Sequence, residues 1–233
     1  MQSGYTAHIT SAEWRWVIIA AVMLVSVAFL PLLLIALSGI SGWQFMGVLH
    51  NHRDGATYLS KMMLGAQGEW LVTFQHTPEP HSGALLMMIY LLLGRMAGTV
   101  NVPVMVLFHV ARVTAALFMY MAIYQLGATI WMRLRTRRIF FILVSIGAGF
   151  GWLYTLLTGG DVSPPDVSIP EAFPFYSSLV NVHFPLTLAC LALLASVVIT
   201  VFRPGIKDEP NLRNGGQVNA LLSLALGYLN PQA

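Results

Sequence analysis

The sequence predicts an all-α membrane protein, built as a polytopic bundle of transmembrane helices. Hydrophobic residues make up 57% of the 233 residues and charged residues only 9%, whereas a soluble domain carries roughly a quarter charged residues. The apolar residues form runs of about 20, the length that crosses the hydrocarbon core of a bilayer. Polar and charged residues are concentrated between these runs. The chain is therefore expected to cross a membrane several times.

Four apolar runs are long enough to be complete spans, and a fifth begins near residue 218. The four lie at residues 16–37, 103–126, 139–157 and 184–202. The first run is longer than the core of a signal peptide, and no clear small-residue cleavage pattern follows it. We expect it to remain as the first helix. No linker or repeat divides the chain, which predicts a single transmembrane domain over residues 1–233.

Residues 84–93 are apolar but too few to cross a bilayer. A helix of this length reaches about 15 Å, roughly half of the hydrocarbon thickness. We predict that this segment lies in the membrane interface or re-enters the membrane. The first external loop of the chain would then continue across it until the span at residues 103–126 begins.

Basic residues gather in two of the segments between spans. One segment holds Arg133, Arg135, Arg137 and Arg138, and the other holds Arg203, Lys207 and Arg213. Cytoplasmic loops carry an excess of lysine and arginine, so both segments are predicted to face the cytoplasm beneath a plasma (inner) membrane. With a cytoplasmic N-terminus, this topology requires that residues 84–93 do not cross the membrane. The loops at residues 38–83 and 158–183 then lie on the external side of the membrane.

Acidic residues concentrate in these two external loops. They hold six of the nine acids of the chain, namely Asp54, Glu69, Glu79, Asp161, Asp166 and Glu171. Asp54 comes shortly after the first span and just before an amphipathic stretch at residues 56–64. A carboxylate near the lipid headgroups can act as a general base toward a hydroxyl, or hold a divalent cation against a lipid-linked phosphate. Asp54 could also cap the helix at 56–64, and these roles are compatible.

The order of elements in the first half of the chain resembles the GT-C glycosyltransferases, in particular the protein mannosyltransferase and aminoarabinose transferase branch. The resemblance covers roughly residues 16–160 and is carried by Asp54, Tyr58, Gly68-Glu69-Trp70-Leu71, Pro78-Glu79-Pro80, a half-span ending in Gly94, and Arg112 within the second complete span. It implies transfer of a sugar from a polyprenyl-phosphate-linked donor on the external face. Asp54 would be the catalytic base, and Tyr58, Glu79 and Arg112 would bind substrate.

Two of these residues have alternative roles. Gly55 follows Asp54 where the family often has a second acid, which favours a lone general base over a metal-binding pair. An arginine at membrane depth usually faces a cavity, a partner or a phosphate. Arg112 is therefore expected to balance the charge of the donor phosphate, to pair with a loop carboxylate, or to extend its guanidinium to the outer headgroups.

The second external loop contains four prolines between residues 164 and 174, which exclude a continuous helix there. The resemblance implies that acids of this loop contribute to a metal site, with Asp161, Asp166, Glu171 and His183 as candidates. Oxygen ligands of this kind suit Mg²⁺ or Mn²⁺. Forming turns is the alternative role for Asp161 and Asp166.

Several other classes of function are excluded or disfavoured. The chain has no basic patch of the kind that binds nucleic acid, and its single cysteine, Cys190, allows neither an internal disulfide nor a cysteine-based metal site. No HExxH motif supports a zinc protease. A transporter module and a non-catalytic membrane scaffold remain as alternatives to the glycosyltransferase. Since GT-C proteins have about seven spans, the resemblance also implies that this chain is the N-terminal part of a longer protein.

Overall fold

The computed structural model describes residues 9–38, 42, 45–74, 77–147, 150–159, 164–202 and 212–229. Its helices are α1 (Ser11–Leu37), α2 (His52–Ala66), α3 (Met88–Val100), α4 (Val104–Ile130), α5 (Leu134–Ile146), α6 (Gly151–Leu157), the short 3₁₀ helix η1 (Pro165–Val167), α7 (Pro174–Leu179), α8 (His183–Phe202) and α9 (Leu212–Leu229). Within these residues the only β-type pairing is an isolated antiparallel bridge between Val72 and Ala84. The predicted all-α class is confirmed for this part of the chain.

Three helices in the described residues are long and apolar enough to cross a membrane, namely α1, α4 and α8. They coincide with three of the four predicted complete spans. Large apolar side chains cover the outer surface of α1, where Ile19, Met23 and Leu34 are each about 60% exposed. A soluble protein seldom leaves such a continuous apolar face in water. Helix length and composition together indicate a membrane protein.

The fourth predicted span, at residues 139–157, is not one continuous helix. Helix α5 ends at Ile146, and Gly147 has φ −62° and ψ 69°, which is not helical. The next helix of the described residues, α6, begins at Gly151. Glycine is a poor helix former, and the backbone N–H of Gly151 is held by the Asp166 carboxylate at 2.8 Å. Gly147 and Gly151 therefore lie at a break in the predicted span.

The segment predicted to be interfacial begins later and is longer than expected. Helix α3 starts at Met88 and continues through Gly94 to Val100, so it has 13 residues and remains too short for a span. Residues 84–87 before it are not helical.

The last predicted span, which was expected to begin near residue 218, also differs. Helix α9 begins at Leu212, and it is not among the helices long and apolar enough to cross a membrane.

Helices α2 and α3 approach each other with their backbones in direct contact. A Cβ atom on Gly94 would overlap the carbonyl oxygen of Met62, and one on Gly65 would overlap that of Leu91. Glycine is needed at both positions because no side chain fits between the two helices. This contact sets the position of α2, which carries Asp54.

Valine in place of Gly94 should force α2 and α3 apart and lower the free energy of unfolding by about 1–3 kcal/mol, the usual cost of overpacking. Thermal unfolding in detergent measures this loss. Gly227 is a matched control because a Cβ atom there would meet no atom within 4 Å. Equal melting temperatures for Gly94→Val and Gly227→Val would contradict the close contact.

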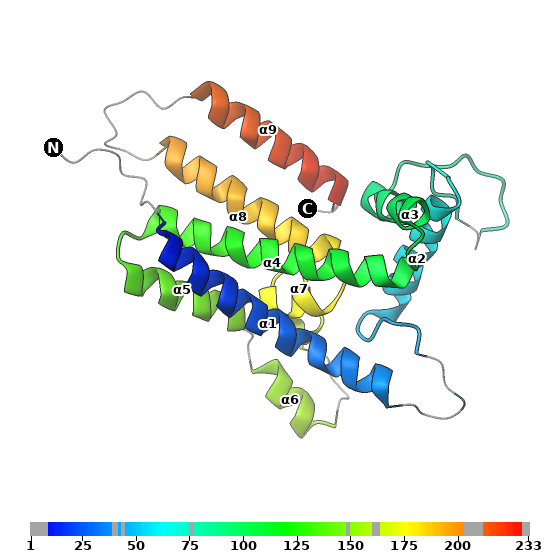
Figure 1. The fold of residues 1–233 in the computed structure, drawn as a ribbon, viewed down its shortest axis with the longest axis horizontal. Coiled ribbons are helices and arrows are strands. Elements are labelled where there is room, and N and C mark those ends of the chain that lie inside the picture. Colours follow the sequence, from blue (N-terminus) through cyan, green and yellow to red (C-terminus); the bar gives the residue numbers. More distant parts are fainter. Residues whose placement is uncertain are drawn as a thin grey trace.

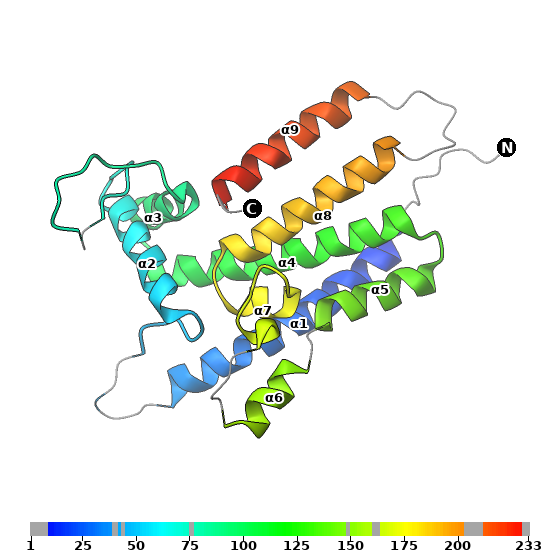
Figure 2. The ribbon, with the colours of Figure 1, turned by 180° about the vertical axis from the view of Figure 1, so that it is seen from behind.

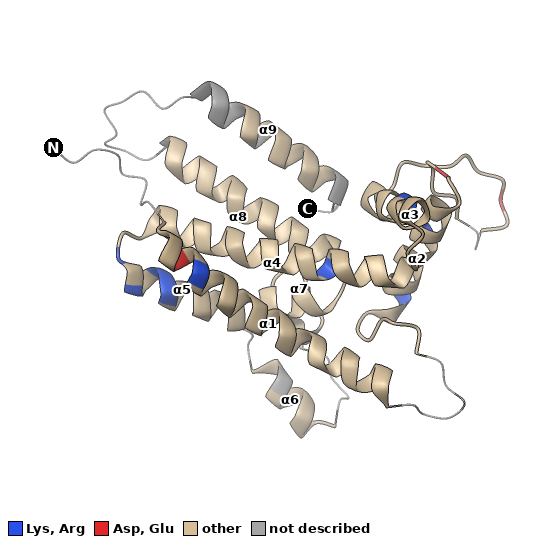
Figure 3. Cartoon of the chain, in the orientation of Figure 1, with Lys and Arg blue, Asp and Glu red and all other residues tan. Residues whose placement is uncertain are grey.

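The long helices lie side by side and share two ends (Figures 1 and 2). At one end, here called the arginine end, α1 and α5 begin and α4 finishes, and Glu13, Tyr124 and Arg137 meet there. At the opposite end, called the loop end, α4 and α8 begin beside α2 and α3, whereas α7 lies between the two ends, next to α1, α4 and α5. Lysine and arginine concentrate near the start of α5 (Figure 3). Of the second basic segment, Arg203 and Lys207 lie outside the described residues.

Candidate functional site

Asp54 lies in the first turn of α2, at the loop end. The residue before this helix is Asn51, which has the left-handed backbone conformation with φ 51°. The Asn51 side-chain amide donates a hydrogen bond of 2.8 Å to Asp54 Oδ2. The prediction that Asp54 caps the helix is therefore wrong, because the helix begins two residues earlier at His52. Its carboxylate is exposed, and it lies where the helix dipole favours negative charge.

A polar hollow of about 520 Å³ joins the two loops that were predicted to be external. Its lining residues are His50, Asn51, Asp54, Ser168, Ile169, Pro170, Glu171, Tyr176 and Phe184. Asp54 comes from the first loop and Glu171 from the second, so the fold directs two carboxylates far apart in the sequence to one hollow. Two carboxylates in one polar hollow can accept a proton, orient a hydroxyl group or bind a cation.

The tyrosines and the histidine at the hollow favour their neutral forms near pH 7. Burial, with the charges of Asp54 and Glu171, raises the pKa of Tyr58 to about 12. Burial and Glu171 also raise the pKa of Tyr176. Burial and the charge of Arg112 lower the pKa of His50, which therefore favours its neutral form. The hollow thus combines two carboxylates with neutral groups that can donate or accept hydrogen bonds.

Three aromatic side chains support α2 next to the hollow. The rings of Tyr58 and Tyr90 are stacked, with centroids 4.5 Å apart and planes at 9°. The Tyr90 hydroxyl lies 2.7 Å from His183 Nδ1, and the His183 ring packs edge-on against Tyr58. His183 is buried, and this contact with Tyr90 engages one of its two ring nitrogens. The cluster ties α2 and α3 to the first residue of α8.

Lys61 is a buried cation of α2 that the sequence analysis did not single out, and it does not line the hollow. Its side chain is only 6% exposed, and its ammonium nitrogen lies 5.0 Å from the centroid of the Tyr58 ring. Among the described residues no carboxylate lies within ion-pair distance of it. Burial lowers its pKa, and the charge of Asp54 opposes this shift. The sequence spacing could have indicated this position. Residues at i, i+4 and i+7 share one face of a helix, and Asp54, Tyr58 and Lys61 have this spacing.

Arg112 has a different environment from any that the sequence predicted. It is 1% exposed, and its Nη1 donates hydrogen bonds to the backbone carbonyls of Leu179 at 2.9 Å and Val180 at 3.4 Å. Its guanidinium lies 4.2 Å from the centroid of the Phe29 ring. It neither extends to the surface nor lines the hollow. Arg112 therefore holds the carbonyl end of α7 against α1 and α4.

Methionine in place of Arg112 should leave these carbonyls without a donor and cost about 1–3 kcal/mol for each. Thermal unfolding in detergent measures the effect. Arg53→Met is the matched control, because Arg53 is an exposed cation on α2. If both variants unfolded at the same temperature, the proposed structural role of Arg112 would be wrong.

The remaining predicted site residues are not gathered at the hollow. Glu79 is exposed in the segment between α2 and α3 and does not line the hollow. Asp166 is buried and accepts the Gly151 N–H, so it holds the start of α6. In the part of the chain that the structure describes, no three His, Cys, Asp or Glu side chains are grouped to hold a metal ion. Asp166, Glu171 and His183 therefore do not form the predicted group, and Asp161 lies outside the described residues.

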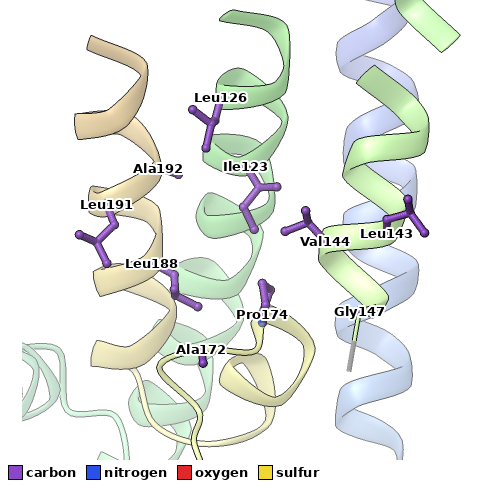
Figure 4. Close-up of a pocket in the computed structure, with 10 residues that line it drawn as sticks. All are labelled: Ile123, Leu126, Leu143, Val144, Gly147, Ala172, Pro174, Leu188, Leu191 and Ala192. Carbon is purple, nitrogen blue, oxygen red and sulfur yellow. The ribbon is translucent and has the colours of Figure 1, made fainter. Parts of the chain in front are cut away.

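Two further hollows are apolar. One, of about 560 Å³, lies between α4, α5, α8 and the segment leading into α7, and Figure 4 shows its lining of Ile123, Leu126, Leu143, Val144, Gly147, Ala172, Pro174, Leu188, Leu191 and Ala192. The other, of about 420 Å³, lies between α3, α4 and the start of α8. It is lined by Ile89, Leu93, Met96, Leu107, Val110, Ala111, Thr114, Ala115, Phe118, Val182 and Leu186. Both suit hydrocarbon and carry no ionisable group.

Comparison of the chain with family models, with curated proteins and with solved structures gives no match. The polar hollow at the loop end is therefore the feature of the molecule that indicates its function.

Proposed function

We propose that the chain is a membrane glycosyltransferase of the GT-C type, which takes a sugar from a polyprenyl-phosphate-linked donor at the loop end. The observation that carries this proposal is that Asp54 and Glu171, from two separate loops, line one polar hollow beside the starts of α4 and α8. A lipid-linked donor presents its sugar at this depth. The positive-inside rule favours the external side for the loop end, since arginines gather at the other end.

Asp54 would act as the general base. Its carboxylate accepts the proton of an acceptor hydroxyl while the hydroxyl oxygen forms a bond to the anomeric carbon of the sugar. The bond between that carbon and the phosphate oxygen breaks, and polyprenyl phosphate leaves with the bonding electrons. The hydrogen bond from Asn51 holds one carboxylate oxygen and leaves the other for the acceptor.

Glu171 would orient the acceptor or share a cation with Asp54. A magnesium ion is commonly held by one or two carboxylates together with water and substrate phosphate, and Mn²⁺ accepts similar oxygen ligands. Asp54 and Glu171 both line the hollow and would supply such oxygens. A bound Mg²⁺ or Mn²⁺ would neutralise charge on the donor phosphate.

Lys61 replaces Arg112 as the proposed cation for the phosphate. Arg112 is occupied by the carbonyls of Leu179 and Val180, whereas Lys61 has no carboxylate partner among the described residues and lies on the Asp54 face of α2. The polyprenyl chain would occupy the apolar groove between α3, α4 and α8. That groove includes Val182, the residue before His183.

The test is transfer of sugar from polyprenyl-phosphate donors in membranes that contain the full reading frame, comparing the parent with Asp54→Asn. Loss of transfer at equal protein level supports the proposal. Undiminished transfer in the variant, or no transfer by the parent from any such donor, would overturn it in favour of a non-catalytic scaffold. A transporter module is disfavoured because Arg112, the charge at membrane depth, is enclosed by backbone carbonyls and lines no path.

A further inference from the structure

The arginine end carries positive charge that no acidic side chain of the described residues balances. Glu13 is the acid at this end, and all of its interactions are internal. Its Oε1 accepts hydrogen bonds of 2.9 Å from both Arg137 and Tyr124, and its Oε2 accepts from the backbone and the hydroxyl of Thr10. Arg137 also donates to the carbonyl of Trp131 at 2.7 Å. Glu13 and Arg137 therefore neutralise each other and fix the start of α5 against the start of α1.

The neighbouring arginines of α5 have no such partner. Arg133 and Arg135 are exposed, and Arg138 is partly buried with its guanidinium 5.0 Å from the centroid of the Trp16 ring. The buried Nε of Arg138 has no hydrogen-bond acceptor. Arg135 and Arg138 stand three residues apart on one helix, where like charges repel. An external anion between them would relieve this repulsion and satisfy the Arg138 donor.

The surroundings of these arginines are those of the membrane–water interface. Trp14, Trp16 and Trp131 all lie at this end, and tryptophan is enriched at the level of the lipid headgroups. The rings of Trp14 and Trp16 pack on Tyr124, near the end of the membrane helix α4. An anion that reaches Arg135 and Arg138 at this depth is therefore most readily a lipid phosphate.

We infer that Arg133, Arg135 and Arg138, with the exposed Arg15 near the start of α1, form a binding surface for the phosphate of an anionic phospholipid. Arginine presents a planar fork of donors that matches phosphate oxygens. An anionic headgroup fits better than a zwitterionic one, because the ammonium of a zwitterionic lipid would meet four arginines. The first turn of α5 has no side-chain cap, so its free N–H groups add to the attraction. This inference is independent of the proposed sugar transfer.

The experiment places the full chain in nanodiscs of phosphatidylcholine with and without phosphatidylglycerol, and measures by native mass spectrometry how much phosphatidylglycerol stays bound. Arg138→Gln and Arg135→Gln should each lower retention about fivefold, from the typical attraction of about 1 kcal/mol per arginine near an anionic surface. Arg53→Gln is the matched control, because it removes the same charge from an exposed position on α2 at the loop end.

Equal losses for all three variants would overturn the inference, since diffuse charge would then explain the binding. Displacement of the lipid by millimolar inorganic phosphate would also overturn it, because the surface would then bind a free anion. If Arg138→Gln does not fold, Arg135→Gln carries the test, because the Arg135 side chain is exposed and contributes little to packing.

Discussion

Asparagine in place of Asp54 should lower sugar transfer by about 10²–10⁴-fold, the range typical of a lost general base. The amide has nearly the same shape as the carboxylate, and its oxygen can still accept the 2.8 Å hydrogen bond from Asn51. The start of α2 should therefore remain intact while the proton acceptor is lost. Initial rates in membranes, normalised to the amount of folded protein, measure the effect.

Glu79 and Glu171 make this experiment specific to the hollow. Glu171→Gln should also reduce transfer, because Glu171 lines the hollow together with Asp54. Glu79→Gln should leave transfer unchanged, because Glu79 is exposed elsewhere in the first loop. A loss with Glu79→Gln as large as that with Asp54→Asn would show that the substrate site is not the hollow described here.

Glutamine in place of Glu13 should lower the free energy of unfolding by about 3–5 kcal/mol, the usual cost of breaking a buried ion pair. Glu13 and Arg137 have side chains 7% and 5% exposed and lie 2.9 Å apart. Removing the carboxylate leaves the Arg137 guanidinium buried without a counter-charge. It also leaves Tyr124 without its charged acceptor. Unfolding in detergent, followed by loss of helical circular dichroism, measures the change.

The double variant Glu13→Met/Arg137→Met is the informative control. Replacing both members of a buried ion pair with apolar residues is often close to neutral or even stabilising. The double variant should therefore be more stable than Glu13→Gln alone. If the two were equally unstable, the loss would come from packing around Glu13 and not from an unpaired charge. Both variants leave the hollow at the loop end unchanged.

The local structure around the site was predictable because it depends on residues that are close together in the sequence. The amphipathic stretch at residues 56–64 predicts the helix α2, which also includes Asp54. The prolines of the second loop predict that it forms no long helix, and it forms none among the described residues. The predicted metal group is wrong because it depends on how the second loop folds and on which partners its side chains meet. The Asp166 carboxylate accepts a hydrogen bond from the backbone N–H of Gly151 at the start of α6. One ring nitrogen of His183 is hydrogen-bonded to the Tyr90 hydroxyl.

The same distinction holds for Arg112 and Lys61. The sequence shows that Arg112 is a charge within an apolar run, but not which acceptors surround it. The fold brings the end of α7 to Arg112, where two backbone carbonyls accept from its Nη1, while its buried Nε has no acceptor among the described residues. The sequence does not distinguish Lys61 from a surface lysine, and the fold buries it on α2, which packs closely on α3 through Gly65 and Gly94.

The sequence by itself determined the helical class, the three helices long and apolar enough to cross a membrane (α1, α4 and α8), and the presence of acids in the loops. These properties depend on the length and hydropathy of contiguous residues, and neither changes with the tertiary contacts of the chain. Only the tertiary structure decided that Asp54 and Glu171 line one hollow and that the helix of α5 stops at Ile146. Such features depend on contacts between distant segments, whose energies arise only when the helices pack.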